Sequence, residues 1–177
     1  MTRAQVACLA LLCTLLVFDG SRAVPQRVEN SGAASSTLEV AVAEHLADLN
    51  PQLSKRQLQR IASAVVRNSE KYDLDPTLVV GVISAESSAR PWVRSPKGAV
   101  GLMQVMPYMM GSLDVAGNLT SIESNIEAGC MILADNIRRL GEARGILTYF
   151  WGNDVRGVSY LERVQEARAA VRRRVES

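Results

Sequence analysis

Glu86 is the residue of this sequence whose type and position best suit acid chemistry. Val79, Val82 and Ile83 recur at helical spacing, and Glu86 falls three residues further along the same stripe. A carboxyl group on a core-facing stripe is partly desolvated, so we expect its pKa to be raised. Such a group can protonate a glycosidic oxygen near neutral pH. On position alone, the alternative is a glutamate that ends a helix in solvent.

The sequence offers little material for other kinds of catalytic group. His45 is the only histidine, which excludes a histidine metal cluster and leaves a Cys-His or Ser-His-Asp apparatus without partners. Cys130 lies in an apolar stretch and is predicted to be a small buried hydrophobic residue. Asp114 and Glu123 are conceivable partners of Glu86, but their loop and helix-start positions favour capping or solvent exposure. We therefore expect no metal and no organic cofactor.

The segment after Glu86 is rich in glycine, and its residues are first polar and then apolar. This composition favours a loop that can bring hydrogen-bond donors against a sugar ring. Its spacing resembles the signature of the soluble lytic transglycosylase family (goose-lysozyme-like, with the transglycosylase SLT domain). The matching residues are Glu86-Ser87, Pro91, Ser95, Gly98-Ala99, Gly101-Leu102-Met103-Gln104 and Met106-Pro107. A second block of the family is similar to Asn125-Ile126, Gly129 and Ile132-Leu133. A third, normally Tyr-Asn-Ala-Gly, is similar to Tyr149-Phe150-Trp151-Gly152, and together the blocks cover roughly residues 60 to 165.

This resemblance implies a single goose-lysozyme-like helical domain with a groove for the glycan strands of peptidoglycan. Glu86 is implied as the acid on the bond between N-acetylmuramic acid and N-acetylglucosamine, and then as the base on the muramic C6 hydroxyl. Attack by that hydroxyl leaves a 1,6-anhydromuramic end. The implied substrate-binding residues are Ser87, Ser95, Met103, Gln104, Met106 and Tyr149, with the Tyr149 hydroxyl bonded to the glutamate. A hydrolytic lysozyme on the same fold and a catalytically silent peptidoglycan-binding scaffold remain open as alternatives.

Three positions depart from the family pattern. Ala89 replaces an aromatic residue, which predicts a more open cleft wall, and Phe150 replaces an asparagine, which removes an amide. Met109 replaces a common threonine, which predicts a local capping change. Trp92 is either a sugar-stacking platform or an exposed loop residue.

The elements that must position these residues are predicted to be helices. Aliphatic residues are abundant and aromatic residues make up only 5%, which favours an all-α fold. We expect helices over 38–49, from Ser54 and from Pro76 to about Ser87, a short helix over 101–110, and helices ending at Gly141, over 142–151 and from Ser159. Capping boxes are predicted at Ser54 with Gln57, Ser124 with Glu127, and Ser159 with Glu162.

The chain divides into three predicted parts. Residues 1–23 have a short apolar run with small residues after it, which predicts a cleaved export signal, and the run is too short for stable membrane insertion. Residues 24–53 are predicted to be a leader, flexible over 24–37, with a possible short helix, and 54–177 the catalytic domain. The expected location is periplasmic or secreted. A net charge of +2 argues against a nucleic-acid partner, and an envelope-spanning secretion or pilus apparatus is a hypothetical partner in local wall opening.

Overall fold

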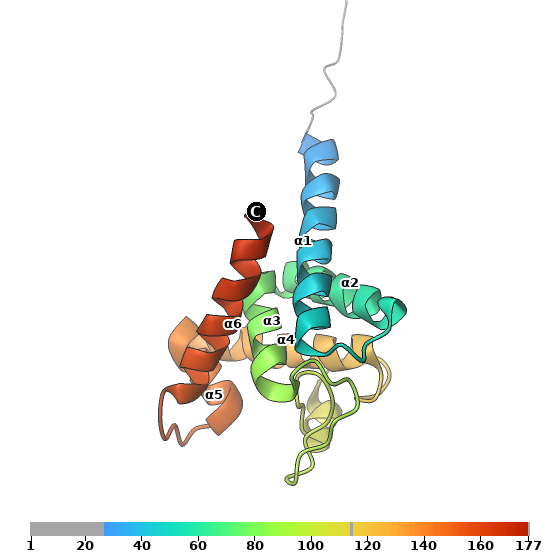
Figure 1. The fold of residues 1–177 in the computed structure, drawn as a ribbon. Helices are drawn as coiled ribbons and strands as arrows, with labels where there is room; N and C mark the ends of the chain where they lie inside the picture. The colour runs from blue at the N-terminus through green and yellow to red at the C-terminus, as the bar shows by residue number, and fades with distance from the viewer. Residues whose placement is uncertain (1–26, 114, 177) are drawn as a thin grey trace, which may run out of the picture.

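The computed structural model describes residues 27–113 and 115–176, which form helices joined by loops (Figure 1). The helices are α1 (Arg27–Leu49), α2 (Lys55–Tyr72), α3 (Pro76–Ser87), the 3-10 helix η1 (Pro107–Ser112), α4 (Ile122–Leu140), α5 (Glu142–Trp151) and α6 (Ser159–Val175). Across the described ranges there are isolated β-bridges but no strands, so the predicted all-α class is confirmed. The predicted export signal at 1–23 lies outside the described residues.

The central helix of the fold is α3, whose residues from Thr77 to Ile83 are all buried. A helix that is apolar all round belongs in a core. The Asp75 carboxylate caps its start by accepting a hydrogen bond of 2.8 Å from the Thr77 backbone N–H, and Pro76 takes the first helical position. As predicted, the helix begins at Pro76 and holds Glu86 in its final turn.

Helix α6 lies directly against α3 (Figure 1). The approach is close because Gly81 has no side chain: a Cβ atom there would lie 2.6 Å from the carbonyl oxygen of Val164. Tyr160 lies one helical turn before Val164 and is completely buried. The glycine thus brings the start of α6 to the end of α3, where Glu86 lies.

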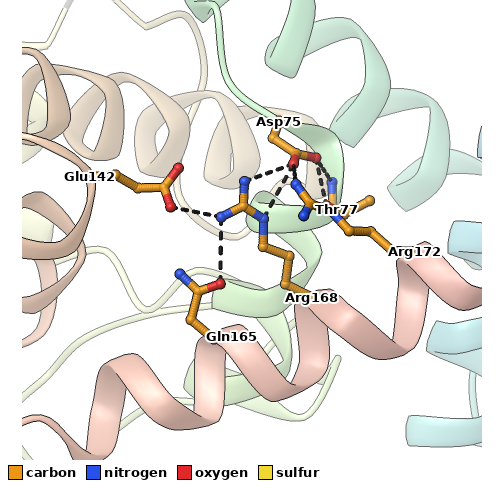
Figure 2. A network of polar contacts seen from close by, with 6 residues as sticks. All are labelled: Asp75, Thr77, Glu142, Gln165, Arg168 and Arg172. Carbon is orange, nitrogen blue, oxygen red and sulfur yellow. Dashed lines mark hydrogen bonds and ion pairs between the residues drawn. The ribbon is translucent and has the colours of Figure 1, made fainter.

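A network of polar contacts fixes α6 to the start of α3 (Figure 2). The Arg168 guanidinium donates to Asp75 at 2.8 Å and to Glu142 at 2.8 Å, and Arg172 donates to Asp75 at 2.5 Å. Burial alone would raise the pKa of Asp75, but hydrogen bonds from Thr77, Arg168 and Arg172 outweigh it and hold that pKa well below its usual range. Since the Arg168 side chain is only 10% exposed, this contact is shielded from water.

Helix α1 is longer than the sequence predicted. It begins at Arg27, so the segment expected to be a flexible leader is helical over 27–37, and Figure 1 shows its first turns projecting beyond the other helices. Residues 27–37 include small polar residues but also two alanines and no proline, so no proline interrupts the helix there. Its later turns bury Ala41, Val42 and Leu46 in the core. No helix in the described ranges is long and apolar enough to cross a membrane.

Of the three predicted capping boxes, the structure forms one. At the start of α2 the Ser54 hydroxyl accepts from the Gln57 backbone N–H, and the Gln57 side chain accepts from the Ser54 backbone N–H, as predicted. The other two predictions are wrong. The side chain of Ser124 lies inside α4 and donates to the Ala116 carbonyl at 2.8 Å, and α6 starts at Ser159 without any side-chain cap.

The segment from Gly101 to Met106 also differs from prediction. In place of a short helix it forms a tight loop closed by paired backbone bonds between Val100 and Val105, of 3.0 and 3.1 Å. The 3-10 helix η1 then starts at Pro107. Gly141 ends α4, as predicted, and α5 spans the predicted residues 142–151.

Candidate active site

A cavity of about 520 Å³ lies beside the end of α3 and contains Glu86. In Figure 1 the end of α3 lies between α5 and the loop that follows α3. These two elements, with the turn after α5, supply the other lining residues: Ser95, Pro96, Lys97, Ala99, Gln104, Met106, Tyr149, Phe150, Trp151 and Arg156. Glu86 is the only carboxylate among the described residues that line this cavity.

Another cavity, of about 700 Å³, lies between α2, η1 and α4. It is larger, but none of the predicted site residues lines it. Because the predicted chemistry depends on an acid in an apolar setting, the smaller cavity with Glu86 is the candidate active site.

The environment of Glu86 favours the protonated acid. Its side chain is half-buried, and the Tyr160 hydroxyl donates to Oε1 at 2.7 Å. Burial raises the pKa of Glu86 to about 7, although the hydrogen bond from Tyr160 and the positive charge of Arg163 act in the opposite direction. The raised pKa expected from the helical stripe is therefore confirmed.

The hydrogen bond to the glutamate comes from a different tyrosine than predicted. The Tyr149 hydroxyl donates to the Met103 carbonyl at 2.7 Å, whereas Tyr160 donates to Glu86. Tyr160 was absent from the predicted site. Its signal in the sequence was its place on the apolar stripe of α6 with Val164, because a core tyrosine needs a partner for its hydroxyl.

Polar side chains hold the loop after α3 in shape. The Ser95 hydroxyl accepts from the Ala99 backbone N–H at 3.0 Å. The amide nitrogen of Gln104 donates to the carbonyls of Val93 and Gly101, at 3.1 and 2.9 Å. Ser95 and Gln104 both line the cavity, as do the predicted Met106 and Tyr149.

Asn125 fixes this loop to α4. Its side-chain nitrogen donates to the Val100 carbonyl at 2.8 Å, and its oxygen accepts from the Met103 backbone N–H at 2.9 Å. The loop can come this close because Gly101, at a φ of 81°, would place a Cβ atom 2.4 Å from the Asn125 side chain. Gly129 of α4 leaves room in the same way for the Met103 side chain. The second block of the resemblance is therefore a support for the loop.

Two of the predicted substrate-binding residues do not line the cavity. Ser87 is 1% exposed, and its hydroxyl donates to the Ile83 carbonyl one turn earlier in α3. Met103 is completely buried in the core against Gly129. Ser87 follows the lining residue Glu86 and Met103 precedes the lining residue Gln104, but both side chains face the interior, which a motif without coordinates does not reveal.

The remaining candidates have other environments. Glu123 is bound by Arg60, whose hydrogen bond lowers the pKa of the carboxyl to about 2, and it does not line the cavity. Asp114 lies outside the described residues. Cys130 is buried, as predicted, and burial raises the pKa of its thiol.

The structure also shows where the residues that depart from the family pattern lie, together with Trp92. Ala89 is completely buried and does not line the cavity, and the more open cleft wall expected from its short side chain stays a prediction. Trp92 is 60% exposed and lies outside the cavity lining, as an exposed loop residue would. Phe150 does line the cavity, and its ring stacks on that of Tyr160 with 4.5 Å between centroids.

Comparisons with known proteins identify the family of this chain and several relatives. The family model described as the transglycosylase SLT domain matches residues 63–160, more than half of the chain. The chain is similar to a transglycosylase of Enterobacteria phage PRD1, with 42% identity over 84 residues, which are 48% of this chain and 31% of the relative. It is also similar to the membrane-bound lytic murein transglycosylase E of Buchnera aphidicola, with 31% identity over 64 residues, 36% of this chain and 29% of the relative. The matched part therefore spans less than a third of either relative.

Among solved structures, the lytic transglycosylase Slt of Pseudomonas aeruginosa, crystallised as an inactive mutant, aligns with a TM-score of 0.46 and 21% identity. The alignment covers 71% of this chain and 23% of that one. The family model matches from within α2 to the first turn of α6, so it includes Glu86, the loop that follows α3, and Tyr160. On this match, the chain belongs to the transglycosylase SLT domain family.

Proposed function

We propose that the protein is a peptidoglycan lytic transglycosylase that cleaves the β-1,4 bond between N-acetylmuramic acid and N-acetylglucosamine. The observation that carries this proposal is a cavity in which Glu86, with its pKa raised to about 7, is the only carboxylate among the described lining residues. Ordinary glycosidases of both stereochemical classes use two carboxyl groups. A cavity with one suits a reaction in which the substrate supplies its own nucleophile.

Glu86 carries out both proton transfers in the proposed reaction. Its proton moves to the glycosidic oxygen as the bond from the muramic anomeric carbon to that oxygen breaks. The muramic C6 hydroxyl then attacks the anomeric carbon, and its proton returns to Glu86. The products are an N-acetylglucosamine end and a 1,6-anhydromuramic end, and no water is consumed. A pKa of about 7 suits both steps, because neither protonation state is strongly disfavoured at neutral pH.

The residues that line the cavity, and those that pack behind it, have matching proposed roles. Tyr160 fixes the Glu86 carboxyl by a hydrogen bond, and Ser95 and Gln104 contact the sugar. Because the Gln104 nitrogen is already engaged by two loop carbonyls, its side-chain oxygen is the atom it can offer to a substrate hydroxyl. Met106 and the ring of Tyr149 supply apolar wall. Ser87 and Met103 act at a distance, by packing behind the site.

Activity against purified peptidoglycan tests this proposal. We expect the protein to release soluble muropeptides and Glu86→Gln to release none, because the amide cannot donate and recover the proton. Glu123→Gln is the matched control: it also removes a carboxylate, but from a residue outside the cavity, and should retain activity. Equal release by wild type and Glu86→Gln would remove Glu86 from the mechanism. No release by either would favour the silent scaffold.

We further propose that the protein acts in the periplasm or outside the cell, since its proposed substrate lies there. The relatives named as membrane-bound lytic murein transglycosylases support the substrate class. A role in local wall opening for a secretion or pilus apparatus is a finer hypothesis. Affinity purification from cross-linked cells should recover a component of such an apparatus, and recovery of none would contradict that role.

A further inference from the structure

Phe150 is an aromatic residue that lines the same cavity as the proposed acid and packs against the tyrosine bonded to it. Its ring stacks on Tyr160 with 4.5 Å between centroids and 15° between planes. It also meets Trp151 edge to face, at 4.9 Å and 87°. The residue is 45% exposed and lines the same cavity as Glu86.

The stacking contributes to the complete burial of Tyr160, together with the Arg163 guanidinium, which lies 5.6 Å from the centroid of the tyrosine ring. Tyr160 is 0% exposed and donates to Glu86 at 2.7 Å. Phe150 both lines the cavity and stacks on the Tyr160 ring, so it separates that ring from the cavity. A small residue at position 150 would expose the ring to water. The position of Tyr160 itself depends on the contact of α6 with Gly81, so it does not require Phe150.

We propose that Phe150 is a positioning residue that covers the Tyr160 to Glu86 hydrogen bond, keeps bulk water away from the acid, and so favours attack by the muramic C6 hydroxyl over attack by water. This inference rests on the proposed function. Both outcomes begin alike, with the Glu86 proton moving to the leaving oxygen as the glycosidic bond breaks. In the favoured outcome the C6 oxygen bonds to the anomeric carbon and returns its proton to Glu86. In the hydrolytic outcome, the oxygen of a water molecule bonds to the anomeric carbon and the water gives a proton to Glu86.

The ionisation of Glu86 reports on this cover, because burial is the main cause of its raised pKa. The other titratable or charged groups that face Glu86 are Tyr160 and Arg163 from α6, Tyr149 from α5, and Lys97 and Arg156 from the loops that line the cavity. None of them is removed by a substitution at Phe150. A change in the Glu86 titration on such a substitution therefore measures the entry of water.

The test compares Phe150→Ala with Phe150→Tyr, which keeps the ring, and with Trp92→Ala, which removes an exposed aromatic residue outside the cavity. Carbon NMR of labelled glutamate carboxyls follows the titration, and the Glu86 signal is assigned by its absence in Glu86→Gln. We expect the wild-type midpoint near 7 to fall by about one unit in Phe150→Ala and to stay in place in the other two variants. Mass spectrometry of digested peptidoglycan should show a several-fold higher ratio of hydrolysed to anhydro ends for Phe150→Ala alone.

An unchanged Glu86 midpoint or an unchanged product ratio in Phe150→Ala would overturn this inference, as would an equal change in Trp92→Ala. The titration needs no substrate. A wild-type protein that forms no anhydro ends would contradict the proposed function, whereas a wild-type protein that forms them, with a Phe150→Ala variant that behaves identically, would contradict only the role of Phe150.

Discussion

Replacing Glu86 by glutamine should stabilise the protein at alkaline pH and leave its stability unchanged at acid pH. In the unfolded chain the carboxyl ionises near its ordinary pKa of 4.5, whereas in the folded protein it ionises near 7. Between these values the folded state binds the proton more tightly, so the free energy of unfolding falls as the pH rises from about 4.5 to about 7. Glutamine stays neutral at every pH, so the free energy of unfolding of the variant does not fall in this way. Its side-chain oxygen can still accept the hydrogen bond from Tyr160.

The expected gain follows from the size of the shift. A difference of about 2.5 pKa units corresponds to about 3 kcal/mol. Because Glu86 is only half-buried, screening by water lowers this, and we expect Glu86→Gln to be more stable than wild type by about 2 kcal/mol at pH 8. At pH 4 the two proteins should agree. Urea unfolding at both pH values, followed by circular dichroism, measures the difference.

Glu123→Gln is the control with the opposite sign. The Glu123 side chain is 38% exposed and bonded to Arg60, which lowers its pKa to about 2. Its contribution to stability is present above the ordinary pKa and lost as the pH falls towards 2, so the substitution should cost under about 1 kcal/mol at pH 8. An equal effect of Glu86→Gln at pH 4 and pH 8, or a loss of stability at pH 8, would refute the argument that Glu86 is desolvated.

Three further substitutions test how the site is positioned. Asp75→Asn keeps a capping side chain but removes the negative charge that its two arginine partners bind. Urea unfolding at pH 7 should show a loss of about 1–3 kcal/mol, and this loss should shrink as the pH falls below 3.8. Gly81→Ala places a methyl group 2.6 Å from the Val164 carbonyl oxygen and should cost about 1–3 kcal/mol and lower activity, whereas Gly111→Ala, with nothing within 4 Å, should change stability by less than about 0.5 kcal/mol. Tyr160→Phe removes a hydrogen bond that lowers the pKa of the acid, so its NMR titration midpoint should rise by about one unit.

The position of the acid was predictable because its causes are local. Asp75 and Pro76 start α3 by side-chain and ring geometry within three residues, and the stripe that ends at Glu86 spans two turns of one helix. The same holds for the capping box at Ser54, where both partners lie within one turn. Local patterns failed where the helix begins at a different residue. Ser124 has the spacing of a capping box, but α4 already begins at Ile122, so Ser124 lies within the helix and its hydroxyl donates to the Ala116 carbonyl.

The partner of the acid was not predictable because its causes lie far apart in the chain. Tyr160 is 74 residues from Glu86 and reaches it only because Gly81 allows α6 to approach α3. Tyr149 matches the family motif in sequence, but its hydroxyl is taken by the Met103 carbonyl. The motif residues therefore predicted much of the cavity wall. The hydrogen bond from Tyr160 to Glu86 could not be predicted from the motif, because it depends on how α6 packs against α3.

The mass of the muramic ends formed from purified peptidoglycan in ¹⁸O-labelled water tests the central claim most directly. If Glu86 donates its proton to the leaving sugar and the muramic C6 hydroxyl closes the ring, the ends lack one water and carry no label. Ends that contain the label would show that water is the nucleophile and would contradict the assignment of the protein as a lytic transglycosylase.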